Sequence, residues 1–175
     1  MQNITLLKEA IIERGKAILE IERERIGLRE DMKDIKTELR VILPKGWAEK
    51  AIKIYLNKGM KQEEADTYQQ LCDLLGIGFV CGTYMPTLGQ EETPELAEKK
   101  KKILDILKRY QVLKSELDDL TVQVRQEYAI AKTKDISVPL LKKLVDFVLN
   151  PDKLRAYHED TPLLETYTEV IPEIE

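Results

Sequence analysis

Apolar residues recur at alternating steps of three and four along the first part of the chain. In a heptad frame that starts at Ile4, ten of the twelve a and d positions are apolar, and the exceptions are Arg14 and Arg25. No proline interrupts the pattern before Pro44. A repeat of this length predicts a coiled-coil helix at Thr5–Leu43, whose apolar seam needs a partner helix. The two arginines cost stability in the seam and can set its register.

Short helices are expected after this long one. A Pro-Lys-Gly break predicts a turn, and apolar residues at helical spacing then predict helices at Trp47–Asn57 and Gln62–Leu75. The next stretch, Gly76–Pro94, holds four glycines and two prolines, which is typical of a linker. Within it we expect a short extended piece at Gly78–Tyr84.

The same order of elements then repeats. Heptad spacing predicts a second long helix at Glu95–Lys132, followed by short helices at Pro139–Leu149 and Pro151–Val170, the last interrupted near Pro162. An offset of about 92 residues aligns the two halves. We therefore predict an all-α fold with two long heptad helices, each followed by two short helices, in a tandem pseudo-repeat. The predicted boundaries are a first helical unit at 1–76, a linker at 77–94 and a second helical unit at 95–175.

The composition supports long helices and a reducing environment. The chain is 43% hydrophobic and 34% charged but only 6% aromatic, which fits long helices better than a β-sandwich or barrel. Cys72 and Cys81 show neither metal-site spacing nor a disulfide framework, so we expect a cytoplasmic protein. No signal peptide and no membrane-length apolar run is visible, and we expect no membrane association.

Charges are sorted along the chain, although the net charge is only −4. Residues 31–61 contain eight Lys or Arg against four acids, and 99–143 also carry an excess of Lys and Arg. By contrast, residues 62–98 contain eight acids and no Lys or Arg, and 159–175 are acidic as well. Because exposed charges further apart than about 10 Å are largely screened, a basic surface can coexist with an acidic total.

Short lysine-rich segments occur in the same order in both halves. In the first half they are Asp31-Met32-Lys33-Asp34-Ile35-Lys36 and Lys50-Ala51-Ile52-Lys53. In the second half they are Ala131-Lys132, Leu141-Lys142-Lys143-Leu144 and Leu163-Leu164-Glu165-Thr166-Tyr167. In these segments the chain resembles the GapR family of bacterial nucleoid-associated proteins, and it is similar to the small double-strand DNA-binding proteins of T-even phages. Each half, about 70 residues, covers most of one family unit.

The resemblance implies a unit made of a long dimerising helix and two short helices, assembled as a dimer of dimers that clamps overtwisted duplex DNA through lysines. The corresponding cations of the first half are Lys33, Lys36, Arg40, Lys50 and Lys53, and Lys45 lies in the same basic stretch. Those of the second half are Arg125, Lys132, Lys134, Lys142 and Lys143. The chain departs from the family in being a tandem copy, in placing Glu127 at a normally apolar seam position, and in placing Asp146 among the second set of lysines.

We predict a non-sequence-specific double-stranded DNA-binding protein that acts at the nucleoid as a homodimer, without a cofactor or a small-molecule substrate. Phosphate neutralisation would supply its affinity, and no zinc finger or base-reading helix is apparent. The alternative is a coiled-coil adaptor or inhibitor that binds another protein through the acidic segments 62–98 and 159–175. The heptad seam has two alternatives of equal weight, because it can close between the two long helices of one chain or between chains.

Other residues have simpler interpretations. The run Lys99–Lys102 is more typical of a solvated helix end than of a DNA contact. Asp31 and Asp34 stand beside lysines, as expected for ion pairs along a helix. His158 is the only histidine, Cys72 has no histidine near it in sequence, and no phosphate-binding glycine loop occurs. We therefore predict that the protein is not an enzyme.

Overall fold

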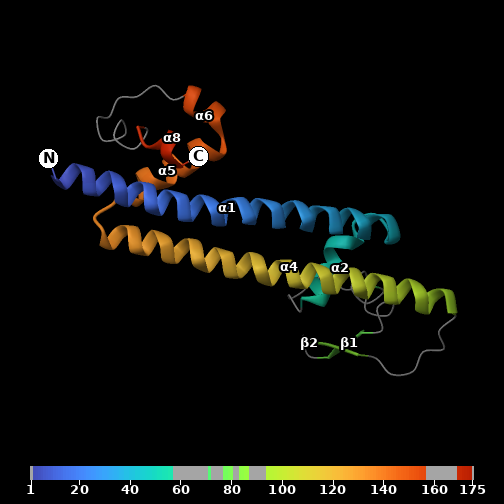
Figure 1. Cartoon of the computed structure of the whole chain (residues 1–175). Coiled ribbons are helices and arrows are strands. Elements are labelled where there is room, and N and C mark those ends of the chain that lie inside the picture. Colours follow the sequence, from blue (N-terminus) through green and yellow to red (C-terminus); the bar gives the residue numbers. More distant parts are fainter. Residues whose placement is uncertain are drawn as a thin grey trace. The chain divides into compact units, whose positions relative to one another are not determined.

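A computed structural model describes residues 2–56, 71, 77–80, 83–86, 94–156 and 169–174 of the chain. These residues are mostly helical (Figure 1), in agreement with the all-α prediction, and they include a short β-hairpin. The helices are α1 (Gln2–Ile42), α2 (Trp47–Tyr55), α4 (Pro94–Thr133), α5 (Val138–Leu149), α6 (Pro151–Ala156) and α8 (Ile171–Ile174). The hairpin pairs β1 (Ile77–Val80) with β2 (Thr83–Pro86) antiparallel, and Phe79 is the register partner of Tyr84.

Most predicted helix bounds agree with the structure to within a few residues. The long helices expected at Thr5–Leu43 and Glu95–Lys132 are α1 and α4, and the short helices expected after them are α2 and α5. The extended piece expected in the linker is the β1–β2 hairpin. The helix predicted at Gln62–Leu75 lies outside the described residues except for Leu71. Of the helix predicted at Pro151–Val170, the structure describes α6 and a turn at its last two residues.

The turn after each long helix contains a residue with left-handed backbone. After α1, Gly46 has φ +81°, and after α4, Asp135 has φ +56°. The amide of Ile136 donates to the carbonyl of Ala131 at 3.1 Å, and the amide of Asp135 donates to the carbonyl of Lys132 at 3.3 Å. This pair of bonds is the Schellman arrangement, which ends α4 and brings Ile136 and Ala131 into the same core.

The chain forms two compact units, and both long helices contribute to each of them. The terminal unit contains Met1–Gly27 and Leu117–Glu175, and the central unit contains Leu28–Glu116. This division differs from the predicted sequential boundaries, because each unit combines a piece of α1 with a piece of α4. The predicted units 1–76 and 95–175, with a linker at 77–94, stay a prediction.

The core of the terminal unit joins α1, α4, α5 and α8. Residues of α5 at helical spacing form one buried face that packs into this core. At the C-terminal end, Ile174 of α8 is 3% exposed and lies against Gly15 of α1, where an added Cβ would come within 3.3 Å of it. Gly15 therefore permits the close approach of α8. The buried α1 and α5 members are Ile11, Ile18, Leu19, Leu141, Leu144, Val145, Phe147 and Val148.

The central unit buries apolar residues from α1, α2 and α4. On α2 they follow a helical spacing that starts just after the turn at Gly46, so the short helix lays one face against the unit. Leu71 is also fully buried. The buried residues of the three helices are Met32, Ile35, Leu39, Ala48, Ala51, Ile52, Ile54, Ile103, Ile106, Leu107 and Tyr110.

In each unit, the α1 and α4 pieces run in opposite directions and contact each other within one chain (Figure 1). In the terminal unit Arg14 donates to Glu127 at 2.7 Å, and in the central unit Arg109 donates to Glu38 at 2.5 Å. The sequence analysis left open whether the heptad seam closes within one chain or between chains. In this single-chain structure, α1 contacts α4 of the same chain in both units. The coiled-coil geometry and the tandem repeat stay predictions. Among the described helices, none has an apolar stretch of the length that crossing a bilayer requires.

Candidate nucleic-acid interface

The last third of α1 carries its acids and its cations on different sides. Residues four, seven and eleven positions apart share one side of an α-helix. Arg29, Lys33, Lys36 and Arg40 have this spacing, and we call them the basic side of α1. Asp31, Asp34 and Glu38 are three and four positions apart and therefore occupy another side, whereas the fourth acid, the exposed Glu30, lies beside Arg29 and three positions before Lys33. The buried residues Met32, Ile35 and Leu39 lie between the two sides.

Two members of the basic side contact their surroundings. The guanidinium of Arg40 donates to a carboxylate oxygen of Glu49 on α2, with Nε at 3.2 Å. This bond, helped by the nearby charge of Lys36, holds the pKa of Glu49 below its usual value. The ammonium of Lys36 lies 5.8 Å from the ring centroid of Tyr110, near the outer limit of cation–π contact.

The other two members have no carboxylate partner in the described chain. Arg29 and Lys33 are both exposed, and no ion pair links either of them to the described acids. Thr37 donates only to the backbone carbonyl of Lys33. This part of α1 therefore presents two cations to solvent that form no ion pair with the described acids.

The remaining predicted cations of the central unit lie on α2 and in the turn before it. Lys45 and Lys53 are exposed, and Lys50 is half-buried. Three of the four lysines of the run 99–102 are exposed, as expected of a solvated helix end. The described residues of the central unit hold fourteen Lys or Arg against nine acids.

The second predicted set of cations lies in the terminal unit, where the described cations and acids are nearly equal in number. Lys134 forms an ion pair with Glu13 at 2.9 Å, and the ammonium of Lys142 lies 5.2 Å from the ring centroid of Tyr128. Lys143 is exposed, as are Arg125 and Lys132, which are seven residues apart on α4. The described residues of this unit hold twelve Lys or Arg against thirteen acids.

Asp146, which the sequence analysis placed among these lysines, bonds elsewhere. Its carboxylate accepts from the ammonium of Lys153 at 2.7 Å and from the side-chain amide of Asn150 at 2.9 Å. Lys153 follows Asp146 by seven positions, across the break between α5 and α6. Sequence reasoning missed this pair because helical spacing does not extend across such a break.

The polar seam residues of the terminal unit pair with one another. Arg14 and Glu127, each noted in sequence as an exception to its own heptad pattern, are joined across α1 and α4. Arg25 forms an ion pair with Glu22, and the Nε atoms of Arg14 and Arg25 are buried without a hydrogen-bond partner. Burial, followed by the charge of Glu22, raises the pKa of Tyr128 to about 12. The Arg14–Glu127 bond could have been predicted from the sequence, because the two residues carry opposite charges at seam positions of the two long helices.

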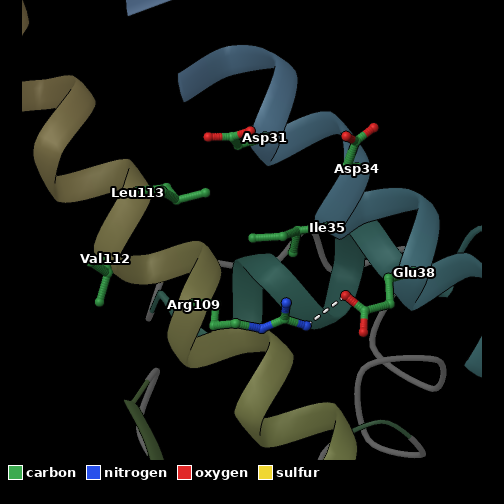
Figure 2. Close-up of a pocket in the computed structure, with 7 residues that line it drawn as sticks. All are labelled: Asp31, Asp34, Ile35, Glu38, Arg109, Val112 and Leu113. Carbon is green, nitrogen blue, oxygen red and sulfur yellow. Dashed lines mark hydrogen bonds and ion pairs between the residues drawn. The ribbon is translucent and has the colours of Figure 1, made fainter. Parts of the chain in front are cut away.

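A groove lies on the acidic side of α1, facing α4. We call it the acidic groove; it has a volume of about 490 Å³ and is lined by Asp31, Asp34, Ile35, Glu38, Arg109, Val112 and Leu113. Figure 2 shows Ile35 and Leu113 pointing toward one another between the helices, and Arg109 reaching from α4 to Glu38. The prediction that Asp31 and Asp34 form ion pairs with neighbouring lysines is wrong for the described chain, because their side of α1 turns away from Lys33 and Lys36.

Among the described residues, no group of three or more His, Cys, Asp or Glu could hold a metal ion. Cys72 and His158, the two residues considered for catalysis, lie outside the described residues. Comparison with protein-family models, curated proteins and solved structures gave no significant match.

Proposed function

We propose that this protein binds double-stranded DNA through its phosphates, without reading base sequence, and that the basic side of α1 in the central unit makes the principal contact. The observation that carries the proposal is the sorting of charge on one helix. Arg29 and Lys33 are exposed without a carboxylate partner in the described chain, while Asp31, Asp34 and Glu38 of the same stretch lie on another side. A polyanion can therefore approach the cations without meeting these three acids, although Glu30 lies near them.

The size of the basic side suits contact with several phosphates. Arg29 and Arg40 are eleven residues apart, which corresponds to about 16 Å along a helix at 1.5 Å per residue. Duplex DNA carries one phosphate charge per about 1.7 Å of its axis, so a cation row of this length faces several phosphates. Each phosphate contact releases counterions and makes the affinity depend on salt but not on sequence.

The resemblance to the GapR family adds a proposal about assembly. Two copies of the chain would present two basic sides to one duplex at the nucleoid, as in the clamp that the resemblance implies. Because α1 and α4 contact each other within the chain, we propose that such a dimer forms through a surface other than the predicted heptad seam. The segments 62–98 and 159–175, which the alternative adaptor function would use, lie largely outside the described residues.

The test is titration of a fluorescent duplex with the full chain at salt concentrations from 50 to 200 mM. The double variant Arg29→Gln/Lys33→Gln is expected to lower the slope of log affinity against log salt by about 1.8, because two phosphate contacts are lost. Its matched control is Lys16→Gln/Arg23→Gln, which removes the same charges from α1 in the terminal unit and should leave the slope unchanged.

The same titration distinguishes the two predicted sets of cations. We expect Arg125→Gln/Lys132→Gln to change the slope less than Arg29→Gln/Lys33→Gln does. If the wild-type chain fails to bind the duplex at 50 mM salt, or if both double variants bind as it does, the proposal is wrong.

A further inference from the structure

We propose that the acidic groove of the central unit binds a cationic amphipathic helix of a partner protein. An apolar side chain of that helix would lie over Ile35 and Leu113. Lysine or arginine side chains one turn away would pair with Asp31 and Asp34. This site is distinct from the basic side of α1, and it does not depend on DNA binding.

The apolar part of the groove is partly accessible, mainly through residues of α4. Ile35 is only 7% exposed and forms part of the floor, and Leu113 is half-buried beside it. Val112 on α4 is 55% exposed at the groove. A partner side chain that covers these three residues removes apolar surface from water on both molecules.

The negative charges of the groove favour a partner with positively charged side chains. Asp31 and Asp34 are exposed, and neither takes part in an ion pair or hydrogen bond within the described chain. Glu38 shows what such a carboxylate binds, because the guanidinium of Arg109 reaches it from the facing helix at 2.5 Å (Figure 2). A cation on a partner helix would form ion pairs with Asp31 and Asp34, as Arg109 does with Glu38.

The spacing of the acids favours a helical occupant. Asp31, Asp34 and Glu38 lie three and four residues apart, so their carboxylates follow the groove at intervals of one turn. A helix packed alongside α1 repeats its own side chains at the same interval, which matches cations to acids while apolar residues face the floor. A nucleic acid is excluded from the groove because its phosphates would face these carboxylates.

The probe is a fluorescent peptide of two Leu-Lys-Lys-Leu-Leu-Lys-Leu repeats, which places leucine and lysine on opposite faces of a helix. We expect the full wild-type chain to bind it with micromolar affinity that weakens from 50 to 200 mM salt. Asp31→Asn/Asp34→Asn should weaken binding about tenfold or more, because both partners of the peptide cations are lost. The matched control is Glu20→Gln/Glu24→Gln, which removes two exposed acids from α1 in the terminal unit and should bind as the wild type does.

Methyl NMR locates the peptide. Peptide addition is expected to shift the methyl signals of Ile35, Val112 and Leu113, and a peptide of the same composition with leucine and lysine mixed around the helix should not shift them. The proposal is overturned if Asp31→Asn/Asp34→Asn binds the peptide as tightly as the wild type, or if these methyl signals do not move.

Two further measurements distinguish this proposal from self-association through the groove and from the DNA-binding proposal. If sedimentation shows that the wild-type chain self-associates and Asp31→Asn/Asp34→Asn does not, the groove is occupied by a second copy and the proposal is wrong. The duplex titration is then repeated with this variant. Its DNA binding should be retained, since the acids lie off the basic side, so failure at the groove and failure at the DNA surface give different results.

Discussion

The central and terminal units are both built from a piece of α1, a piece of α4 and short helices, yet they use their charges differently. In the terminal unit, carboxylates reach cations across elements, as Glu127 does with Arg14, Glu13 with Lys134 and Glu169 with Lys8. In the central unit, Glu49 and Glu38 also pair across elements, with Arg40 and Arg109, but Arg29 and Lys33 on one side of α1 and Asp31 and Asp34 on another have no partner in the described chain.

The difference shows what decides whether a basic helix end is available to a ligand. Both long helices end in lysines and arginines, so the two ends look equivalent in sequence. Their availability depends on whether an acid on the neighbouring element lies within about 4 Å. The position of that acid is set by the pairing of helices distant in sequence and not by the number of lysines.

The largest expected effect is a difference in the free energy of unfolding between loss of the half-buried Arg14–Glu127 ion pair and loss of the exposed Arg109–Glu38 ion pair. Glu127→Leu should lower the free energy of unfolding by about 2–3 kcal/mol, because it leaves Arg14 without its partner in the seam. The side chain of Arg14 is 14% exposed and that of Glu127 is 21% exposed. Glu38→Leu should cost about 0.5 kcal/mol or less, because Arg109 and Glu38 are 56% and 42% exposed. Urea unfolding monitored by circular dichroism measures both.

The double variant Arg14→Leu/Glu127→Leu is the control for this comparison. It should recover most of the stability lost in Glu127→Leu, since an apolar pair suits the seam. Equal losses in Glu127→Leu and Glu38→Leu would show that the two ion pairs do not differ as described.

A smaller effect is expected at the turns that end the two long helices. Gly46→Ala should destabilise the protein by about 1 kcal/mol, because φ +81° is strained for a residue with a Cβ. Asp135→Gly should stabilise it by about 0.5 kcal/mol, because glycine suits the left-handed position of a Schellman turn. Thermal unfolding compares the two variants.

Gly27→Ala is the control for the turn variants. Gly27 lies inside α1, and an added Cβ would meet nothing within 4 Å, so this change should stabilise the helix by up to about 1 kcal/mol. Destabilisation by Asp135→Gly would contradict the assignment of that turn.

The smallest expected effect concerns the pKa of one carboxyl group in each unit, Glu13 in the terminal unit and Glu49 in the central unit. Hydrogen bonds from Lys134 and Arg14 lower the pKa of Glu13, and a hydrogen bond from Arg40 is the main cause that lowers the pKa of Glu49. Because both pKa values lie below the usual 4.5 in the folded chain, the stability linked to them is present above pH 4.5 and is lost as pH falls through the folded pKa.

Carboxyl NMR measures these two titrations directly. Lys134→Gln should raise the midpoint of Glu13 without moving Glu49, and Arg40→Gln should do the reverse. A common response of both carboxyls to either variant would mean that overall charge, and not the local bond, sets their titration.

The helices themselves were largely predictable from sequence. The heptad spacing located α1 and α4, and the Pro-Lys-Gly break before Trp47 located the start of α2. Helix formation depends on neighbours three and four positions apart, so its signal is local. The same holds for α5, whose buried face repeats at helical spacing.

The contacts between helices were not predictable in the same way. The bond between Arg14 and Glu127 joins residues 113 positions apart, and Gly15 meets Ile174 at the other end of the chain. Neither periodicity nor charge counts encode which helices pair or in which direction. The acidic groove was missed for this reason, because Asp31 and Asp34 form part of it only when Arg109 and Val112 of α4 lie opposite them.

The sorting of charge on residues 28–42 has a consequence for orientation. In the electric field of a polyanion, attraction on one side of α1 and repulsion on another produce a torque that turns the central unit before any contact forms. The groove rimmed by Asp31 and Asp34 then faces away from the polyanion. If the chain binds DNA as proposed, the proposed peptide-binding groove would then face the surrounding solution, where it could bind a partner protein on the same duplex.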